Sequence, residues 1–138
     1  MQPITPYLNF NGNAREAMEF YNTIFGGKLD IMTFEGMENN MSVADKTKVM
    51  HAVLTAGDLI LMASDVVDEH KMTFGTAVQL SINCESVEQI DRLHAQIAEG
   101  GTVTMPVQDT FWGARFGMAS DKFGIYWMFN FDYPKEGK

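Results

Sequence analysis

The sequence has little cysteine, little positive charge and no long apolar run, and each shortage excludes a class of protein. Its single cysteine, Cys84, cannot form an internal disulfide, which favours a reducing compartment. Only 10 Lys and Arg oppose 18 Asp and Glu, and the net charge of -8 repels nucleic acids and anionic membranes. The longest apolar run, Leu59–Ala63, is too short to cross a bilayer, and the N-terminus lacks a signal-peptide pattern. We therefore expect a cytoplasmic protein that binds neither nucleic acid nor membrane.

The remaining composition is that of an ordinary globular domain. Hydrophobic residues make up 46% and charged residues 20% of the 138 residues, which excludes a disordered, collagen-like or coiled-coil chain. A chain of this length forms one domain, or two very small halves packed as one. We expect a single domain over residues 1–138, with a first module at 1–66, a connection at 67–73 and a second module at 74–133.

Two segments have the periodicity and the end signals of amphipathic helices. Apolar residues recur at helical spacing over Ala14–Phe25 and again over Val87–Ile97. A pair of glycines ends each segment, at 26–27 and at 100–101. Two capping pairs are expected at the N-terminal ends, namely Asn13 with Glu16, and Ser86 with Gln89.

Alternation of apolar and polar residues before and after each helix predicts four strands in each half. The expected strands are Ile4–Phe10, Lys28–Phe34, Val49–Ala56 and Asp58–Ser64, then Thr76–Asn83, Thr102–Val107, Arg115–Ser120 and Ile125–Phe131. The order strand–helix–strand–strand–strand therefore occurs twice. This repeat predicts an α+β fold made of two βαβββ modules.

The strand faces that no helix should cover are unusually apolar. By parity they carry Tyr7, Asn9, Gln79, Ser81, Tyr126 and Met128. A half-solvated sheet with one wet face is the plain alternative. The tyrosines and methionines favour instead a curved mixed sheet around a partly dry cavity, and the total of 11 methionines suits an adaptable cavity wall.

Four motifs follow one another along the chain and carry a family resemblance. They are Pro6–Asn13 (Pro-Tyr-Leu-Asn-Phe-Asn-Gly-Asn), Phe20-Tyr21, Gln108–Gly113 (Gln-Asp-Thr-Phe-Trp-Gly) and Asp121–Met128 (Asp-Lys-Phe-Gly-Ile-Tyr-Trp-Met). In this order they resemble the PhnB-like branch of the vicinal oxygen chelate superfamily, which includes glyoxalase I, bleomycin-resistance proteins and extradiol dioxygenases. The resemblance covers nearly the whole chain and implies the glyoxalase/bleomycin-resistance fold. It also implies a homodimer, because members usually close their cavities by pairing and open sheet edges need cover.

Metal-dependent members of the superfamily place four ligands, typically His, Glu, His and Glu, on the cavity faces of four strands. The matching positions in this sequence are Thr5, Leu61, Ala77 and Met128, and a shift of one residue either way also finds no His or carboxylate. We therefore expect no metal ion and no other cofactor. A methyltransferase label, which some related sequences carry, is rejected because no glycine-rich loop joins a strand to a helix to hold a nucleoside.

Three histidines remain as candidates for other chemistry. His94 lies on the second helix, where we expect it to be exposed, and His70 lies in the connection. His51 opens a predicted strand and is the histidine expected to face a cavity. A lone strand histidine is more often a hydrogen-bonding structural residue than a ligand. A general-base role for His51 is favoured over a metal site, because imidazole titrates near neutral pH.

The segment Val107–Gly113 places two aromatic residues next to a basic one. Phe111 and Trp112 precede Gly113, and Arg115 begins the next predicted strand. Aromatic walls with an adjacent guanidinium suit a flat or anionic small molecule. An almost equal alternative is that the two rings cover a seam between modules or protomers. In bleomycin-binding relatives a similar Trp-Gly segment borders the ligand cleft, and the resemblance implies the same here.

Two functions follow from these observations, and the sequence leaves open whether the protein is an enzyme. The first is a metal-free protein of unknown substrate that binds a small aromatic or anionic molecule. Its expected contacts are Tyr7, Asn9, His51, Gln79, Ser81, Phe111, Trp112, Arg115, Tyr126 and Met128. The second is a lyase-type or isomerase-type enzyme that uses His51 as a base or an atypical metal site.

Overall fold

The structure is a computed structural model that describes residues 1–35, 45–66 and 71–135. The chain splits into two compact units, Met1–Thr73 and Phe74–Lys138, which we describe one at a time. His70 and most of the expected connection at 67–73 lie outside the described residues. None of the described helices is long and apolar enough to cross a membrane.

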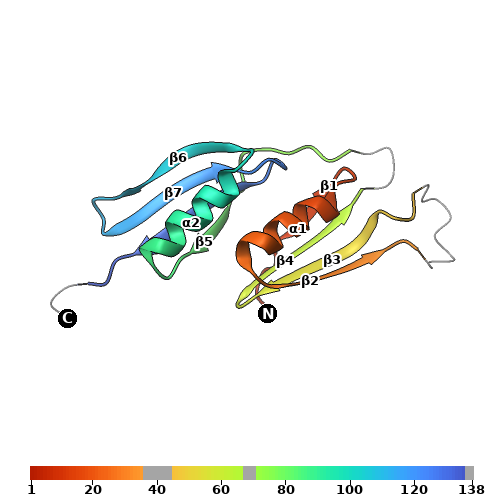
Figure 1. Cartoon of the computed structure of the whole chain (residues 1–138), viewed down its shortest axis with the longest axis horizontal. Coiled ribbons are helices and arrows are strands. Elements are labelled where there is room, and N and C mark those ends of the chain that lie inside the picture. The colour runs from red at the N-terminus through yellow and green to blue at the C-terminus, as the bar shows by residue number, and fades with distance from the viewer. Residues whose placement is uncertain (36–44, 67–70, 136–138) are drawn as a thin grey trace. The chain divides into compact units, whose positions relative to one another are not determined.

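The first unit is one helix on one four-stranded sheet. Its elements are β1 (Tyr7–Phe10), α1 (Ala14–Phe25), β2 (Lys28–Thr33), β3 (Val49–Ala56) and β4 (Leu59–Asp65). The strand order is β1-β4-β3-β2, in which β1 runs parallel to β4 and the other neighbours are antiparallel. Helix α1 lies against one face of this sheet, and no described helix of this unit lies on the other face (Figure 1).

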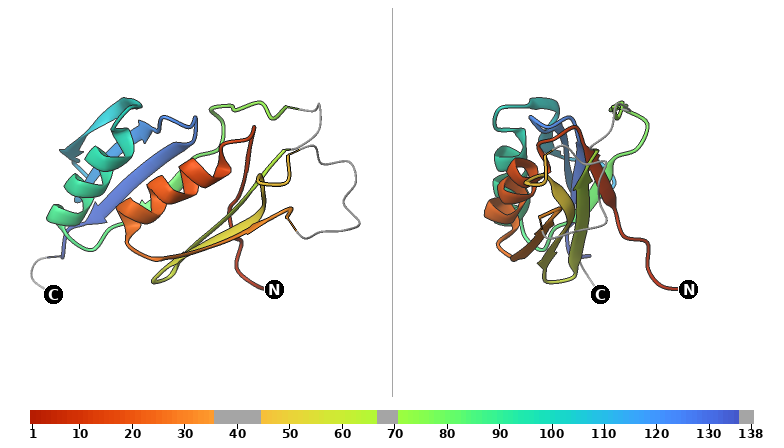
Figure 2. Two further views of the ribbon diagram at one scale, coloured as in Figure 1. Left: turned by 45° about the vertical axis from the view of Figure 1, so that its right-hand side comes forward. Right: turned by 90° about the vertical axis from the view of Figure 1, so that its right-hand side faces the viewer.

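The second unit repeats this arrangement. Its elements are β5 (Leu80–Asn83), α2 (Val87–Ala98), β6 (Thr102–Asp109), β7 (Ala114–Ser120) and β8 (Tyr126–Asp132). The order β5-β8-β7-β6 again begins with a parallel pair, and α2 covers one face (Figure 2). The predicted α+β class with two βαβββ modules is confirmed. The strands form two separate four-stranded sheets, and the cavity stays a prediction.

Each core lies between the helix and the sheet face that parity predicted to be apolar. The buried rows of the first unit include Leu8, Phe10, Leu54, Leu61 and Ala63, which meet Ala17, Met18, Tyr21 and Ile24 of α1. In the second unit, Trp127 and Phe129 of β8 are fully buried with Ile90 and Ile97 of α2. The faces opposite these rows carry the candidate residues.

Two strands begin later than their alternation predicted. β1 begins at Tyr7 rather than Ile4, and β5 begins at Leu80 rather than Thr76. Proline lacks the N–H that a strand donates, so Pro3 and Pro6 weaken the start of the first strand. Residues 76–79 have no partner strand among the described residues, because β8 begins at Tyr126 and pairs from Leu80 onwards. Alternation alone does not make a strand where no neighbour is available.

The two helices are capped in different ways, and only one as predicted. The side chain of Asn13 makes no capping hydrogen bond. Instead Asp65, at the end of β4, accepts hydrogen bonds from the backbone amides of Gly12 (3.1 Å), Ala14 (2.9 Å) and Val49 (2.9 Å). A charged acceptor is the stronger partner, and it neutralises the partial positive charge of the helix end.

The second helix has the predicted local cap. The hydroxyl of Ser86 accepts from the amide of Gln89 at 3.0 Å, and the side chain of Gln89 accepts from the amide of Glu85 at 2.7 Å. This is the reciprocal pattern of a capping box, except that the amide bonded by Gln89 is that of Glu85, one residue before the N-cap Ser86.

A matched pair of glycines supports the internal repeat. Gly27 follows α1 and Gly101 follows α2, and neither has room for a side chain. A Cβ on Gly27 would stand 2.2 Å from the carbonyl oxygen of Thr55 in β3, and one on Gly101 would stand 2.2 Å from that of Ser120 in β7. Strands β3 and β7 hold the same place in their sheets, so the helix returns to the sheet at equivalent points.

Candidate functional site

The expected contact residues divide between the two units. Tyr7, Asn9 and His51 belong to the first unit, and the other seven belong to the second. In the first unit the register brings all three onto the sheet face opposite α1, which we call the open face. In the second unit Ser81, Met128 and Met118 lie side by side on the corresponding face.

The register of the first sheet arranges the open face in rows that run across the strands. One row contains Tyr7, Met62, Val53 and Asp30, taken from β1, β4, β3 and β2 in that order. Met32 is paired with His51 at the β2–β3 contact of the next row. Two apolar members of the face are unusually accessible, since Met32 is 55% and Ile60 40% exposed. The open face therefore mixes apolar side chains with polar ones, and no described helix of this unit covers it.

A tyrosine and a histidine are joined on this face. The hydroxyl of Tyr7 lies 3.1 Å from Nδ1 of His51, and their ring centroids are 5.7 Å apart with a tilt of 32°. Strand β4 separates the strands that carry them, so the tyrosine bridges over the middle strand. Within the described residues, Nε2 of His51 has no hydrogen-bond partner. If Nδ1 donates to the hydroxyl, Nε2 carries a lone pair, and if Nδ1 accepts, Nε2 carries the proton.

The other polar contact of the open face is weaker. The hydroxyl of Ser64 donates to the side-chain oxygen of Asn9 at 3.4 Å, across the β1–β4 pair. Both side chains are polar neighbours of the Tyr7–His51 pair. The sequence predicted Tyr7, Asn9 and His51 as contact residues, and the register adds Asp30, Met32, Val53 and Met62 to the face they share. Parity within each strand was readable, but the register that aligns the strands was not.

In the second unit, the β6–β7 hairpin presents two aromatic rings to solvent. Phe111 is 97% and Trp112 61% exposed, and their rings meet edge to face at 5.1 Å. The turn is fixed by Thr110, whose hydroxyl donates to the carbonyl of Ala114 (2.8 Å) and accepts from its amide (3.1 Å). Gly113 has φ +91°, a conformation that side chains disfavour.

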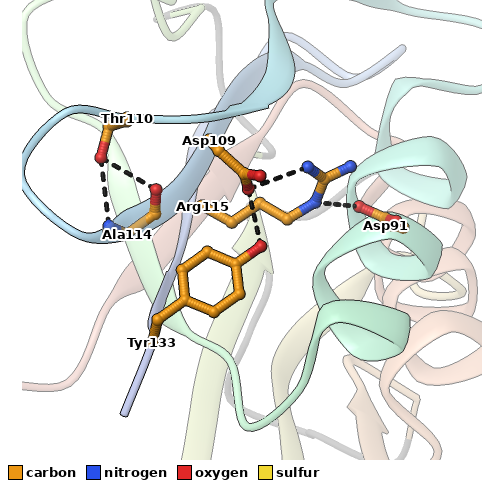
Figure 3. Close-up of polar contacts among 6 residues, drawn as sticks. All are labelled: Asp91, Asp109, Thr110, Ala114, Arg115 and Tyr133. Carbon is orange, nitrogen blue, oxygen red and sulfur yellow. Dashed lines mark hydrogen bonds and ion pairs between the residues drawn. The ribbon is translucent and has the colours of Figure 1, made fainter. Parts of the chain in front are cut away.

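Arg115 lies on the face of the second sheet that α2 covers, which is opposite the face of Ser81 and Met128. Its Nε donates to Asp91 of α2 at 2.8 Å, and its Nη1 donates to Asp109 of β6 at 3.1 Å (Figure 3). Tyr133 donates its hydroxyl to the same Asp109 oxygen at 2.6 Å. The guanidinium therefore joins the helix, the hairpin and the segment after β8. This geometry gives no support to Arg115 as the partner of an anionic ligand.

The network changes the titration of its members. The Tyr133 hydroxyl and the Arg115 guanidinium hold the pKa of Asp109 below its usual value of 3.8. The hydrogen bond to Asp109 raises the pKa of Tyr133 above 10.0, because the neutral phenol is the donor. Hydrogen bonding to Asp91 raises the pKa of Arg115, which stays charged throughout.

The remaining candidate residues are partly or fully buried. Tyr126 and Met128 are half-buried on the open face of β8, and the buried Oε1 of Gln79 has no hydrogen-bond partner among the described residues. The prediction that His94 is exposed is wrong. It is 7% exposed, bonds the carbonyl of Met118 through Nε2 at 3.0 Å and touches Phe129 edge to face. Helical spacing from Ile90 places it on the buried face.

Cys84 is not a candidate nucleophile. It is buried, and burial raises the pKa of its thiol to about 11. A thiol with this pKa is protonated at neutral pH, whereas nucleophilic chemistry needs the thiolate.

The four positions that match the superfamily's metal ligands do not assemble a site. Thr5 and Ala77 precede β1 and β5, and Leu61 is fully buried beneath α1 rather than on the open face. The open-face neighbours in β4 are Ile60 and Met62, which are not His or carboxylate ligands. Across residues 1–35, 45–66 and 71–135, no group of three or more His, Cys, Asp or Glu is placed to hold a metal ion. The residues present therefore do not fit the superfamily's metal centre.

Comparison with known proteins gives the family. A family model described as 3-demethylubiquinone-9 3-methyltransferase matches residues 2–129. The chain belongs to this PhnB-like family. The crystal structure of protein PA1353 from Pseudomonas aeruginosa is 41% identical, with a TM-score of 0.84 over 97% of this chain and 100% of that one. A PhnB protein from Bacillus cereus, called a putative 3-demethylubiquinone-9 3-methyltransferase, is 32% identical, with a TM-score of 0.76 over 94% and 99%.

The wider likeness confirms the fold that the motifs suggested. Protein YjdN of Escherichia coli is 30% identical over 93% of this chain and 94% of its own length. Solved glyoxalase/bleomycin resistance proteins from Burkholderia phytofirmans, Nocardioides and Albidiferax ferrireducens share the fold at 16% to 20% identity, with TM-scores of 0.56 to 0.62. All these proteins share one architecture. A shared architecture does not define a substrate.

The starts of the two helices bear on the methyltransferase name of the family. A nucleotide-binding helix offers its N-terminal amides to the ligand. The corresponding amides of α1, at Gly12 and Ala14, are already bonded to Asp65, and α2 begins at a Ser86 cap. At the start of each helix, one backbone amide is therefore already bonded within the protein, that of Ala14 in α1 and that of Gln89 in α2.

Proposed function

We propose that this PhnB-like protein binds a small aromatic molecule on the open face of the first unit, without a metal ion. The observation that supports it most is the Tyr7–His51 hydrogen bond at 3.1 Å on a sheet face that also carries the apolar side chains of Val53 and Met62. Binding sites combine apolar walls with a few fixed polar groups in this way. The phenol and imidazole supply the polar groups, and their mutual bond fixes both rings before a ligand arrives.

The apolar surroundings favour a flat aromatic ligand over an aliphatic one. Thioether sulfurs such as those of Met32 and Met62 make favourable contacts with ring edges, and their flexible side chains adapt to different outlines. Tyr7 adds a ring that a second ring can meet offset or edge to face. An anionic ligand is not part of the proposal, because Arg115, the cation expected to bind it, is paired with two carboxylates.

The rest of the expected contact set stays in the proposal as a second surface. Phe111 and Trp112 are offered as stacking walls for a flat molecule, and Gln79, Ser81, Tyr126 and Met128 as contacts on the second sheet. Asn9 adds a hydrogen-bonding group to the first. We also propose a cytoplasmic homodimer, because β1 and β2, and likewise β5 and β6, are the outer strands of their sheets. Light scattering that gives a monomer mass at tens of micromolar protein would contradict the dimer.

A titration with indole, phenol and 1-naphthol tests the binding proposal. Amide signals of β1, β3 and β4 are followed by NMR in the wild type, Tyr7→Ala and the control Tyr133→Phe. The wild type and the control should show the same saturable shifts, and Tyr7→Ala should raise Kd about tenfold, as expected for loss of an aromatic anchor. If none of the three compounds shifts the open-face signals, the proposal is wrong.

A second candidate function, general-base catalysis by a lyase or isomerase, rests on Nε2 of His51. Among the described residues this nitrogen has no hydrogen-bond partner, and Tyr7 holds the opposite side of the ring. In the tautomer with the proton on Nδ1, Nε2 accepts a proton from a bound substrate. Exchange of carbon-bound hydrogens next to carbonyl groups, followed by NMR in D2O for a panel of ketones and aldehydes, tests it. Faster exchange that His51→Gln abolishes supports catalysis, and exchange at the buffer rate throughout rejects it.

A further inference from the structure

One row of the open face has an aromatic end and an acidic end. The row contains Tyr7, Met62, Val53 and Asp30, each from a different strand. Neighbouring strands are about 4.8 Å apart, so the row spans roughly 14 Å between its outermost backbones. The two central side chains are apolar. A flat molecule of one or two fused rings therefore fits along the row with one end beside the carboxylate.

Asp30 is the charged residue of that row. It is exposed, and no hydrogen bond or ion pair joins its carboxylate to another described residue. Lys28 faces the same side but is paired with Thr55 in an adjacent row, and the residue on the other side of Asp30, Met32, is neutral. Two further titratable side chains of the described residues lie on this face, namely His51 in the next row and Tyr7 at the opposite end of the row. The chain's net charge of -8 adds a long-range field of the same sign as Asp30.

We propose that the open-face site selects flat aromatic molecules that carry a positive charge, with Asp30 as the counter-ion. This inference rests on the proposed function and names its ligand class. The ring lies on Val53 and Met62 beside the Tyr7–His51 pair, and the cationic group reaches the carboxylate at the edge strand β2. The electron-rich face of Tyr7 further favours a cation over an anion.

The expected selectivity is moderate, because Asp30 is accessible to water. Exposed charge pairs are screened by solvent, which limits the preference for a cation over the neutral ring to about three- to tenfold. The preference should shrink as salt is added, since the Debye length falls from about 10 Å at 0.1 M to about 3 Å at 1 M.

Three ligands with one ring system and different charges test the proposal. Tryptamine is cationic, indole is neutral and indole-3-acetate is anionic at pH 7. Each is titrated by NMR into the full-length wild type, Asp30→Asn, Asp30→Glu and the control Asp58→Asn. Asp58 is an exposed acid in the β3–β4 turn, so its substitution removes the same charge from the same unit outside the row.

The wild type should bind tryptamine about three- to tenfold more tightly than indole, and indole more tightly than indole-3-acetate. Asp30→Asn should remove the advantage of tryptamine, whereas Asp30→Glu and Asp58→Asn should keep it. If indole binds but tryptamine is no tighter, or if Asp30→Asn keeps the order, the cation selectivity is wrong while the proposed function stands. If none of the three ligands shifts the open-face signals, both proposals are wrong.

Discussion

The first unit caps its helix with the last residue of its last strand, whereas the second unit caps its helix locally. Asp65 comes at the end of the module in sequence and bonds the amides of Gly12 before α1, Ala14 at the start of α1 and Val49 at the start of β3. Ser86 bonds an amide three residues away. The same topology therefore tolerates two solutions, and the long-range one joins helix, loop and sheet into one cooperative structure.

The units also differ in where their polar groups gather. The first unit has its hydrogen-bonded Tyr7–His51 pair on the open face. The second unit uses its strongest polar network, around Arg115, on the helix-covered face, where it supports a hairpin with two exposed rings. Identical topology therefore leaves the position of a functional surface to the side chains.

The largest expected effect comes from removing the long-range cap. Asp65→Ala leaves three amides without their acceptor and should destabilise the first unit by about 4 kcal/mol. Ser86→Ala should destabilise the second by about 1 kcal/mol, the usual result for a local cap. Urea unfolding with amide hydrogen exchange read separately in α1 and α2 measures both. Equal losses from the two substitutions would show that Asp65 acts as an ordinary local cap.

Gly27 and Gly101 test whether the two units are structurally equivalent where the helix returns to the sheet. Gly27→Ala and Gly101→Ala each force a Cβ against a backbone carbonyl, and each should destabilise its own unit by about 3 kcal/mol. Gly26→Ala is the control, since it meets open space at φ +69° and should lose about 1 kcal/mol through backbone strain alone. Thermal unfolding of the three variants gives the comparison. A mild effect at only one of the two paired glycines would contradict the equivalence of the modules.

Trp112 tests what the exposed hairpin is for. If it is a stacking wall, Trp112→Ala should weaken indole binding by roughly 1–3 kcal/mol at the second unit, with little change in melting temperature. Val103→Ala, an exposed apolar substitution on β6, serves as the control. The opposite pattern, in which stability or dimer mass falls while affinity is unchanged, would assign Trp112 to a seam.

The smallest expected effect is the pH dependence of the contacts that Asp109 makes with Arg115 and Tyr133 beside the β6–β7 turn. Asp109 has a lowered pKa, so its contribution is present above 3.8 and is lost as the pH falls through the lowered value. Tyr133 has a raised pKa, so its contribution is present below 10.0 and is lost as the pH rises through the raised value. Heteronuclear NOE values at residues 110–114 should stay constant between about pH 4 and 10 and fall as the pH passes the lowered pKa of Asp109 or the raised pKa of Tyr133.

Tyr133→Phe provides the internal control for this dependence. It should remove the alkaline limb and keep the acid limb, because Arg115 still holds Asp109. Both groups are solvent-exposed, so the changes should be modest and should weaken further in high salt. A profile that is flat from acid to alkaline pH would show that the network does not order the turn.

The sequence by itself determined the elements, the repeat and the parity of each strand, because these depend on neighbours a few residues apart. Apolar spacing located α1 and α2, and alternation assigned Leu8 and Phe10 to the core and Tyr7 and Asn9 to the open face. The parity of β7 would also have assigned Arg115 to the helix-covered face with Gly117 and Ala119. The prediction of Arg115 as an anion partner did not take this parity into account.

Tertiary structure alone decided which residues from different strands meet. Register aligned Asp30 with Val53, Met62 and Tyr7, brought the Tyr7 hydroxyl to His51, and turned Asp65 rather than Asn13 into the cap of α1. It also buried His94 against Phe129. Pairing across the sheet depends on loops and packing summed over the whole unit, so no local pattern in the sequence encodes it.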